Sequence, residues 1–339
     1  MAALRGEPTD RIPIMLHNFL MAAHEYGVTM ARFRRDGRAV AESFIRAVEE
    51  YGYDGIVVDI STTTLAGALG VPVDLPDDLP ARTKGSLLSS LEAVADLPEP
   101  DISGYFEVQA LLEAVSLLKS RFKDEVAVRG NCDQCPFSLA ASVRGMENWM
   151  LDLALGDPKL IHGLLAYCAG ATKQMLRLMA AAGADILSNG DSPAGPEMIS
   201  PAMYREFAQP SEIEIAALAH SLDRPYVLHI CGNTSSILKD MVSAGADGLE
   251  LDYKTDARLA RSVLKGRTSF LGNIDPSGVL ALGTPAMVER KTRELLEIFA
   301  GEPRFILNAG CAIPAETPPE NLRAMIRAAS AFEPPVSPG

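Results

Sequence analysis

The chain has 339 residues, of which 47% are hydrophobic and 22% are charged, and its formal net charge is −13. This composition indicates a folded protein with a sizeable core, and the acidic balance argues against a nucleic-acid or anionic-membrane partner. No stretch has the roughly 18 uncharged apolar residues of a membrane helix, and the N-terminal segment lacks the apolar core of a signal peptide. With five cysteines outside any dense loop framework, we expect a protein of the reducing cytoplasm.

Eight short apolar runs recur along the chain and predict β-strands. Most are continuous runs of Val, Ile and Leu rather than alternating patterns, as expected for parallel strands covered on both faces. The runs lie at 11–16, 54–60, 126–131, 184–190, 225–231, 247–253, 268–274 and 304–310.

Helical patterns separate these runs, and several end at a glycine, the usual residue after a helix C-terminus. The joints YGYDGIVV, AAGADILS and SAGADGLE resemble one another, which indicates one βα unit used repeatedly. Eight such units predict a TIM (β/α)8 barrel rather than an open, doubly wound sheet. We expect residues 1–330 to form this single domain, with an elaborated loop within 65–123 over the barrel mouth and a frayed tail at 331–339.

Soft metal ligands follow two of the predicted strands. His229 and Cys231 project to the same side of their strand, because side chains alternate between faces. Cys311 follows the last strand and can reach the same point at the C-terminal end of a barrel, where TIM-barrel chemistry lies. One imidazole and two thiols are typical of a zinc site with an open fourth position. The alternative is a purely structural role, with a buried histidine and two core cysteines. The His-x-Cys spacing alone would not exclude that role.

The other cysteines carry weaker signals. Cys132 and Cys135 form a C-x-x-C pair without a second pair, and Pro136 predicts that Cys135 lies at a helix start. Redox or metal duty for this pair stays open. Cys168 lies in a helix of apolar period and is predicted to be a core residue.

Several longer segments resemble one known superfamily. They are TDRIPI, GDSPAGPEMISPAMYREFAQP, LHICGNTSSIL, GNIDPSGVL and LNAGCAIPAETPPENLRAM. Together they are similar to the uroporphyrinogen decarboxylase superfamily, and most to its corrinoid-linked zinc methyltransferases that use methylcobamide. The resemblance runs from about Leu4 to Ala329, and it implies a TIM barrel whose zinc is held by His229, Cys231 and Cys311. It also implies a displaceable acidic fourth ligand at Asp252, with Glu250 as the second choice.

Two departures separate the branches of this superfamily. The decarboxylases carry an Arg-rich segment after the first strand to hold a polycarboxylate, whereas this chain has HNFLMAAHEYG. Since Arg forks supply such recognition, a tetrapyrrole polycarboxylate would be poorly bound. Where the decarboxylases have a metal-free Gly-His-Gly segment, this chain has Gly310, Cys311 and Ala312. Both departures favour methyl transfer.

The resemblance implies that Zn²⁺ activates a small thiol, or a methoxy or other methylated compound, for exchange of a methyl group with a corrinoid held by a partner protein. Asp191 is the predicted catalytic residue, and His17, Asn18, Asn131 and Asp133 are predicted to bind the substrate. Capping of strand–helix turns is the alternative role for each of these five residues. Tetrapyrrole decarboxylation and a non-catalytic, corrinoid-binding barrel remain as alternative functions. The sequence does not determine whether the protein forms a homo-oligomer.

Overall fold

The computed structural model describes residues 1–332, and its centre is an eight-stranded parallel sheet. A parallel bridge between Ile14 and Leu307 joins the first strand to the last, so the sheet closes into a barrel. The predicted TIM barrel is confirmed. In their order around it, the strands are β1 (Met15–Leu16), β2 (Gly55–Val58), β5 (Ala127–Gln134), β6 (Ile186–Gly190), β7 (Tyr226–Ile230), β8 (Gly248–Leu251), β9 (Ser269–Ile274) and β10 (Phe305–Ala309).

All eight predicted strands are present, but most are shorter than their apolar runs. The exception is β5, which continues past the predicted end at residue 131 and shifts register between Asn131 and Gln134. Such an irregularity bends a strand at its end and redirects the side chains there.

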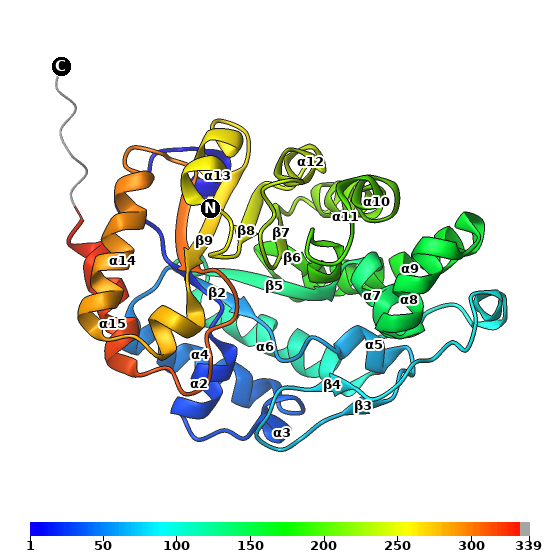
Figure 1. Ribbon diagram of the computed structural model, residues 1–339. Helices are drawn as coiled ribbons and strands as arrows, with labels where there is room; N and C mark the ends of the chain where they lie inside the picture. The colour runs from blue at the N-terminus through cyan, green and yellow to red at the C-terminus, as the bar shows by residue number, and fades with distance from the viewer. Residues whose placement is uncertain (333–339) are drawn as a thin grey trace.

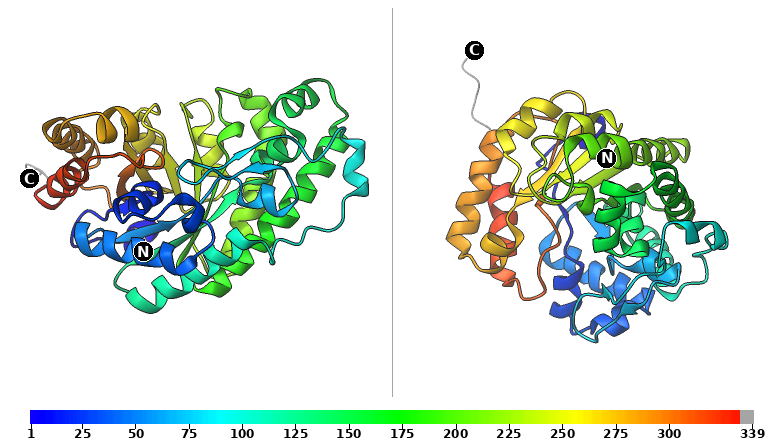
Figure 2. Two further views of the ribbon diagram at one scale, coloured as in Figure 1. Left: turned by 90° about the horizontal axis from the view of Figure 1, so that it is seen from below. Right: turned by 45° about the vertical axis from the view of Figure 1, so that its right-hand side comes forward.

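Helices surround the barrel in all three views (Figures 1 and 2). Two of the helices predicted to end at a glycine do so at a residue with positive φ: Gly52 after α4 and Gly183 after α9. The α-helices are α1 (Ala2–Arg5), α2 (Phe19–Glu25), α3 (Met30–Phe33), α4 (Gly37–Tyr51), α5 (Thr64–Ala68), α6 (Phe106–Phe122), α7 (Pro136–Arg144), α8 (Met146–Leu155), α9 (Pro158–Ala182), α10 (Pro201–Met203), α11 (Gln209–Ser221), α12 (Leu238–Ser243), α13 (Ala257–Leu264), α14 (Pro285–Ile298) and α15 (Pro319–Ser330). Short 3₁₀ or π turns are η1 (Glu92–Asp96), η2 (Ser192–Ala194), η3 (Tyr204–Ala208) and η4 (Pro276–Ala281).

The long segment between β2 and α6 contains α5, a small hairpin of β3 (Val73–Asp74) and β4 (Arg82–Thr83), and η1. It runs along the outside of the barrel, where it is drawn in cyan in Figure 2. The buried guanidinium of Arg34 donates to the carbonyls of Pro76 and Leu79, and Arg144 donates to that of Leu88. The predicted elaboration is therefore held against helices α3 and α7 rather than across the barrel opening.

The lower part of the barrel interior is a closed apolar layer. Its side chains come from six strands and from α1, which covers this N-terminal end, called the floor below. The members are Ala3, Leu4, Met15, Val57, Ile186, Val227, Leu271 and Ile306. This layer fixes which side chains point inward, because residues two positions further along each strand share the same face.

The predicted tail at 331–339 falls outside the described residues except for Ala331 and Phe332. Phe332 packs against the hydrophobic core. Among residues 1–332, no helix combines the length and apolar character needed to cross a bilayer.

Candidate metal and methyl-transfer site

A polar layer lies above the apolar floor layer, at the C-terminal end of the strands, which is called the mouth below. On each strand, the member of this polar layer lies two positions after an inward-facing residue. That residue belongs to the apolar floor layer or adjoins it. Most of these side chains are buried. The layer consists of His17, Asp59, Arg129, Ser188, His229, Glu250, Asn273 and Asn308. The strand periodicity therefore puts titratable groups inside the barrel at one level.

His229, Cys231 and Cys311 meet at the mouth and form the thiol–imidazole cluster. Their ligand atoms all lie within 4.8 Å of one another. His229 Nε2 is 3.0 Å from Cys231 Sγ, and the two sulfur atoms are 3.6 Å apart, as free thiols. His229 reaches this point from β7, while Cys311 arrives from the loop after β10. The meeting predicted from the sequence is thus present.

Charge is unevenly shared in the cluster. A hydrogen bond from the Cys311 thiol and the nearby His229 imidazolium hold the pKa of Cys231 well below its usual value. The same hydrogen bond and burial raise the pKa of Cys311 far above its usual value. Burial opposes the charged form of His229, but the Cys231 thiolate outweighs it and raises the pKa of His229 to about 9. Without a cation, the three groups form a thiolate–imidazolium pair with one protonated thiol.

The backbone fixes the orientation of His229. Its Nδ1 lies 3.0 Å from the carbonyl oxygen of Glu250, so Nδ1–H donates there and Nε2 faces the sulfur atoms. Metal-binding histidines are oriented in this way, with the second ring nitrogen bonded to a carbonyl or carboxylate. One nitrogen and two sulfur donors in this arrangement fit Zn²⁺.

A buried charge network lies beside the cluster. The Glu250 carboxylate pairs with the Arg129 guanidinium, and both side chains are at most 2% exposed. Glu250 Oε1 is also 3.7 Å from Nδ1 of both His17 and His229. His17 Nε2 in turn bonds Asp59 Oδ2 at 2.9 Å. Burial opposes charge on His17, but these carboxylates raise its pKa to about 8. The network links the predicted substrate residue His17 to the cluster through Glu250.

The two acids proposed as a fourth ligand have other partners. Within residues 1–332, the group of ligand atoms inside 4.8 Å comprises the histidine and two cysteines, without Asp252 or Glu250. Asp252 accepts hydrogen bonds from the backbone nitrogens of Gly232 and Lys254, both at 2.9 Å. Asp252 therefore holds the turn directly after Cys231, and its role as a ligand stays a prediction.

Asn131, Asp133 and Asn18 take different positions. Asn131 Oδ1 is 3.4 Å from Ser188 Oγ in the interior of the barrel. Asp133 is buried, has a positive φ of 58° and accepts from the backbone nitrogen of Leu65 at 2.7 Å. Asn18 is one position out of phase with inward-facing His17 and is buried at the start of α2. Of these three, Asn131 is the best placed to face a substrate.

Asp191 also lies out of phase with the inward residues of β6. It is fully buried, and Oδ1 accepts hydrogen bonds from both the backbone nitrogen and the hydroxyl of Ser138 in the first turn of α7. The structure does not bring this carboxylate into the mouth. The geometry supports a positioning role for Asp191, and the predicted direct role in catalysis remains untested.

The remaining cysteines are core residues. Cys132, Cys135 and Cys168 are fully buried, and burial raises the pKa of each thiol. Cys135 precedes Pro136 at the start of α7, as predicted. All three lie in the hydrophobic core, and none belongs to the group of ligand atoms at the mouth, so they lie apart from its chemistry.

Sequence reasoning missed Arg129. The signal was available, since VAVRGN places one cation inside an otherwise apolar strand. A buried cation requires a partner, and the partner is Glu250 across the barrel.

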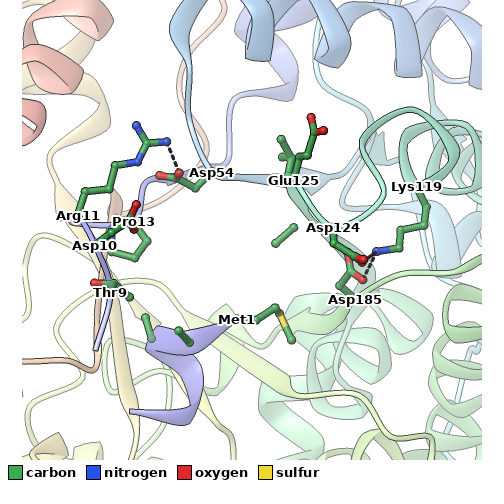
Figure 3. A pocket seen from close by; sticks show the side chains of 14 residues that line it. Met1, Thr9, Asp10, Arg11, Pro13, Asp54, Lys119, Asp124, Glu125 and Asp185 are labelled. Carbon is green, nitrogen blue, oxygen red and sulfur yellow. Dashed lines mark hydrogen bonds and ion pairs between the residues drawn. The ribbon is translucent and has the colours of Figure 1, made fainter. Parts of the chain in front are cut away.

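A cavity lies at the floor, on the other side of the apolar layer from the thiol–imidazole cluster (Figure 3). It measures about 250 Å³ and is lined by residues just before the strands. Arg11 pairs with Asp54 there, and Lys119 with Asp185 (Figure 3). Because TIM-barrel chemistry lies at the opposite end, this cavity is not the candidate site.

Comparisons with known proteins place these observations in a family. The model described as uroporphyrinogen decarboxylase (URO-D) matches residues 1–332. A methylcobamide:CoM methyltransferase, MtbA of Methanosarcina mazei, is 29% identical over 97% of this chain and 96% of its own length. A uroporphyrinogen decarboxylase of Thermus thermophilus is also 29% identical, over 96% and 95%. The solved structure of a methyltransferase from Methanosarcina mazei has the same fold, with a TM-score of 0.88 and 24% identity, covering 97% of this chain and 96% of that one. Identity alone does not separate the two activities, so the site must.

Proposed function

The chain belongs to the uroporphyrinogen decarboxylase family, and from this premise we propose that it moves a methyl group between a corrinoid carried by a partner protein and a small thiol or methylated compound. The observation that carries the proposal is the convergence of His229, Cys231 and Cys311 within 4.8 Å at the mouth. Two relatives named as methylcobamide:CoM methyltransferases support it, at 27% and 29% identity over nearly the whole chain.

We propose Zn²⁺ as the resident metal, held by His229 Nε2 and the two cysteine sulfurs. When bound, zinc supplies a positive charge that lowers the pKa of a thiol and so makes it a nucleophile near neutral pH. The donor set and the orientation of His229 fit this ion.

The protein's own residues orient and balance the site. The carbonyl of Glu250 holds the proton on His229 Nδ1, which leaves Nε2 available as a ligand. Arg129 keeps the Glu250 carboxylate charged in the buried interior, and the pKa of that carboxylate is held well below its usual value. Asp252 fixes the turn after Cys231 through the backbone nitrogen of Gly232. His17 is 13% exposed, and its Nδ1 lies 3.7 Å from Glu250 Oε1, which supports its proposed contact with the substrate.

Tetrapyrrole decarboxylation is the second candidate, and the Thermus thermophilus relative supports it at 29% identity. The site favours it less. A polycarboxylate needs unpaired cations, but Arg129 already pairs with Glu250 inside the barrel. A non-catalytic corrinoid-binding barrel ranks third, because a scaffold alone would not require an oriented metal-ligand set.

Metal analysis and a demethylation assay test the proposal. Purified protein should hold about one zinc per chain. The zinc-loaded protein should remove the methyl group from methylcob(III)alamin when a small thiol is offered, as followed by the absorbance of the cobalamin. Zinc-free protein that consumes uroporphyrinogen instead would establish the second candidate. If the protein binds the corrinoid carrier but transfers no methyl group when thiols or methoxy compounds are offered, the third candidate, a non-catalytic corrinoid-binding barrel, is supported.

A further inference from the structure

The charges around the mouth restrict the kind of methyl substrate that can enter. We propose that the site takes a small substrate whose non-reacting end is neutral or positively charged, and that it disfavours an anionic end. The inference rests on the proposed function, since it concerns the substrate of that same site.

The short segments that join each strand to the next helix carry few cations, and each of these has a carboxylate partner. Further along the connection after β1, the Arg35 guanidinium lies over the Phe106 ring, 4.1 Å from its centroid. Within residues 1–332, the segments that join each strand to the next helix contribute one histidine, His17, and one lysine, Lys254. His17 bonds Asp59 at 2.9 Å, and Lys254 Nζ bonds Glu197 at 3.1 Å. The buried cation of the mouth, Arg129, pairs with Glu250. None of these three offers an anion an uncompensated charge.

Two further cations lie on the long segment between α5 and α6, but they too are paired. Arg82 is 2.9 Å and Lys84 is 3.0 Å from oxygens of Asp74. This segment is held against the outer helices, so its cations neutralise a carboxylate on the outside of the barrel.

Helix N-termini are the other anion-binding elements at this end of a barrel, because their free N–H groups point toward the mouth. In this chain, the N-termini of α5, α7, α13 and η4 are capped by the protein's own carboxyl groups, whereas those of α2, α12 and α15 have no side-chain cap. Asp133 accepts from Leu65 N in α5, and Asp191 from Ser138 N in α7. Asp256 accepts from Leu259 N in α13, and Asp275 from Ser277 N and Gly278 N in η4. The donors that would hold a sulfonate or carboxylate at these turns are already used.

One carboxylate at the mouth, Asp252, has no cationic hydrogen-bond partner among residues 1–332. Asp252 accepts from two backbone nitrogens, and one of them belongs to Gly232, next to Cys231. The nearby ammonium of Lys254 is shared with Glu197. The mouth beside the thiol–imidazole cluster is therefore negative on balance, and the anionic end of a substrate would be repelled by it.

This inference sets the chain apart from the relatives whose names specify CoM. Coenzyme M is 2-mercaptoethanesulfonate, a thiol with an anionic end. The charges at this mouth point to a different methyl acceptor, of the uncharged or aminated class.

The test compares three thiols of similar size with the zinc-loaded protein: 2-aminoethanethiol, 2-mercaptoethanol and 2-mercaptoethanesulfonate. Calorimetry gives their binding constants, and methylcob(III)alamin absorbance gives the rates of methyl transfer. We expect the sulfonate to bind about tenfold more weakly than the neutral thiol, the size of one screened charge interaction. The aminated thiol should bind at least as tightly as the neutral one, and added salt should narrow the differences.

A charge variant at the rim sharpens the test. Glu197→Gln frees the ammonium of Lys254, so we expect it to improve binding of the sulfonate several-fold relative to the neutral thiol. Both side chains are about half exposed, so the fold should tolerate the change. Glu294→Gln on α14 is the matched control: it removes the same charge from an exposed ion pair with Lys291, outside the mouth, and should leave the preference unchanged.

Equal or tighter binding of the sulfonate by the wild-type protein would overturn the inference. Binding in the expected order without methyl transfer would support the charge selection while contradicting the proposed function. If none of the three thiols binds, the inference falls, whereas methyl transfer from a methoxy compound would still support the proposed function.

Discussion

The two ends of the barrel carry the same kinds of charged residue and use them differently. At the floor, Arg11 pairs with Asp54 with side chains 57% and 29% exposed, and the pair ties together segments that precede strands. At the mouth, Arg129 pairs with Glu250 with both side chains nearly free of solvent. Exposed ion pairs contribute little to the free energy of unfolding. Breaking a buried pair is costly, because it leaves one charge buried without a partner. Burial, rather than residue type, therefore makes the mouth the chemical end.

The largest expected effect comes from removing a sulfur ligand. Cys311→Ser should lose zinc, and methyl transfer should fall by more than the roughly 10–100-fold that follows loss of an outer hydrogen-bond partner of a metal site. Zinc content measured by atomic emission and the demethylation rate check this. Cys168→Ala, in the core of α9, is the control and should keep its zinc. Full zinc in Cys311→Ser would remove Cys311 from the ligand set.

The comparison between the ends can be tested with matched arginine variants. Arg129→Gln leaves Glu250 buried without its cation and should lower the free energy of unfolding by about 3–5 kcal/mol. Arg11→Gln breaks an exposed pair and should lower it by at most about 1 kcal/mol. Urea denaturation gives both values. Similar losses for the two variants would contradict the distinction between the mouth and the floor.

Zinc affinity should fall as the pH falls. The pKa of His229 is raised to about 9 and that of Cys311 is raised further, so both carry protons at neutral pH that the metal must displace. Each displaced proton weakens binding by about tenfold per pH unit below its pKa. Competition with a chelator between pH 6 and pH 8 measures the slope. A pH-independent affinity would mean that neither proton is displaced.

The last prediction concerns a buried carboxyl at the mouth. Burial raises the pKa of Asp133 to about 8, above its unfolded value. Its folded form therefore holds a proton that the unfolded chain loses, and stability falls as the pH rises from about 4 through 8, by at most about 1.4 kcal/mol per unit. Asp133→Asn should flatten this slope in denaturation measurements at several pH values. Asp124→Asn, on the fully exposed Asp124 of the floor, should not.

The strands of the barrel were predictable because a parallel strand covered on both faces is apolar along its length, and eight such runs are visible in the sequence. Their ends were less predictable, as β1 and β5 show, because pairing rather than composition ends a strand. The cluster of His229, Cys231 and Cys311 was predictable from the same logic. Strand alternation puts the first two on one face, and the fold brings the third to the same end.

Arg129 and Asp191 show what the sequence left undetermined. Arg129 lies 121 positions from Glu250, and their pairing depends on two strands facing each other across a closed barrel. Asp191 follows a strand but lies one position out of phase with its inward-facing residues, and its carboxyl group accepts from the first turn of α7; its predicted role in catalysis stays a prediction. The sequence alone thus determined the repeated βα units and the residue types at their ends. Only the tertiary structure decided which of those side chains share the interior, because that depends on the phase of each strand and on burial, both set by the closed barrel.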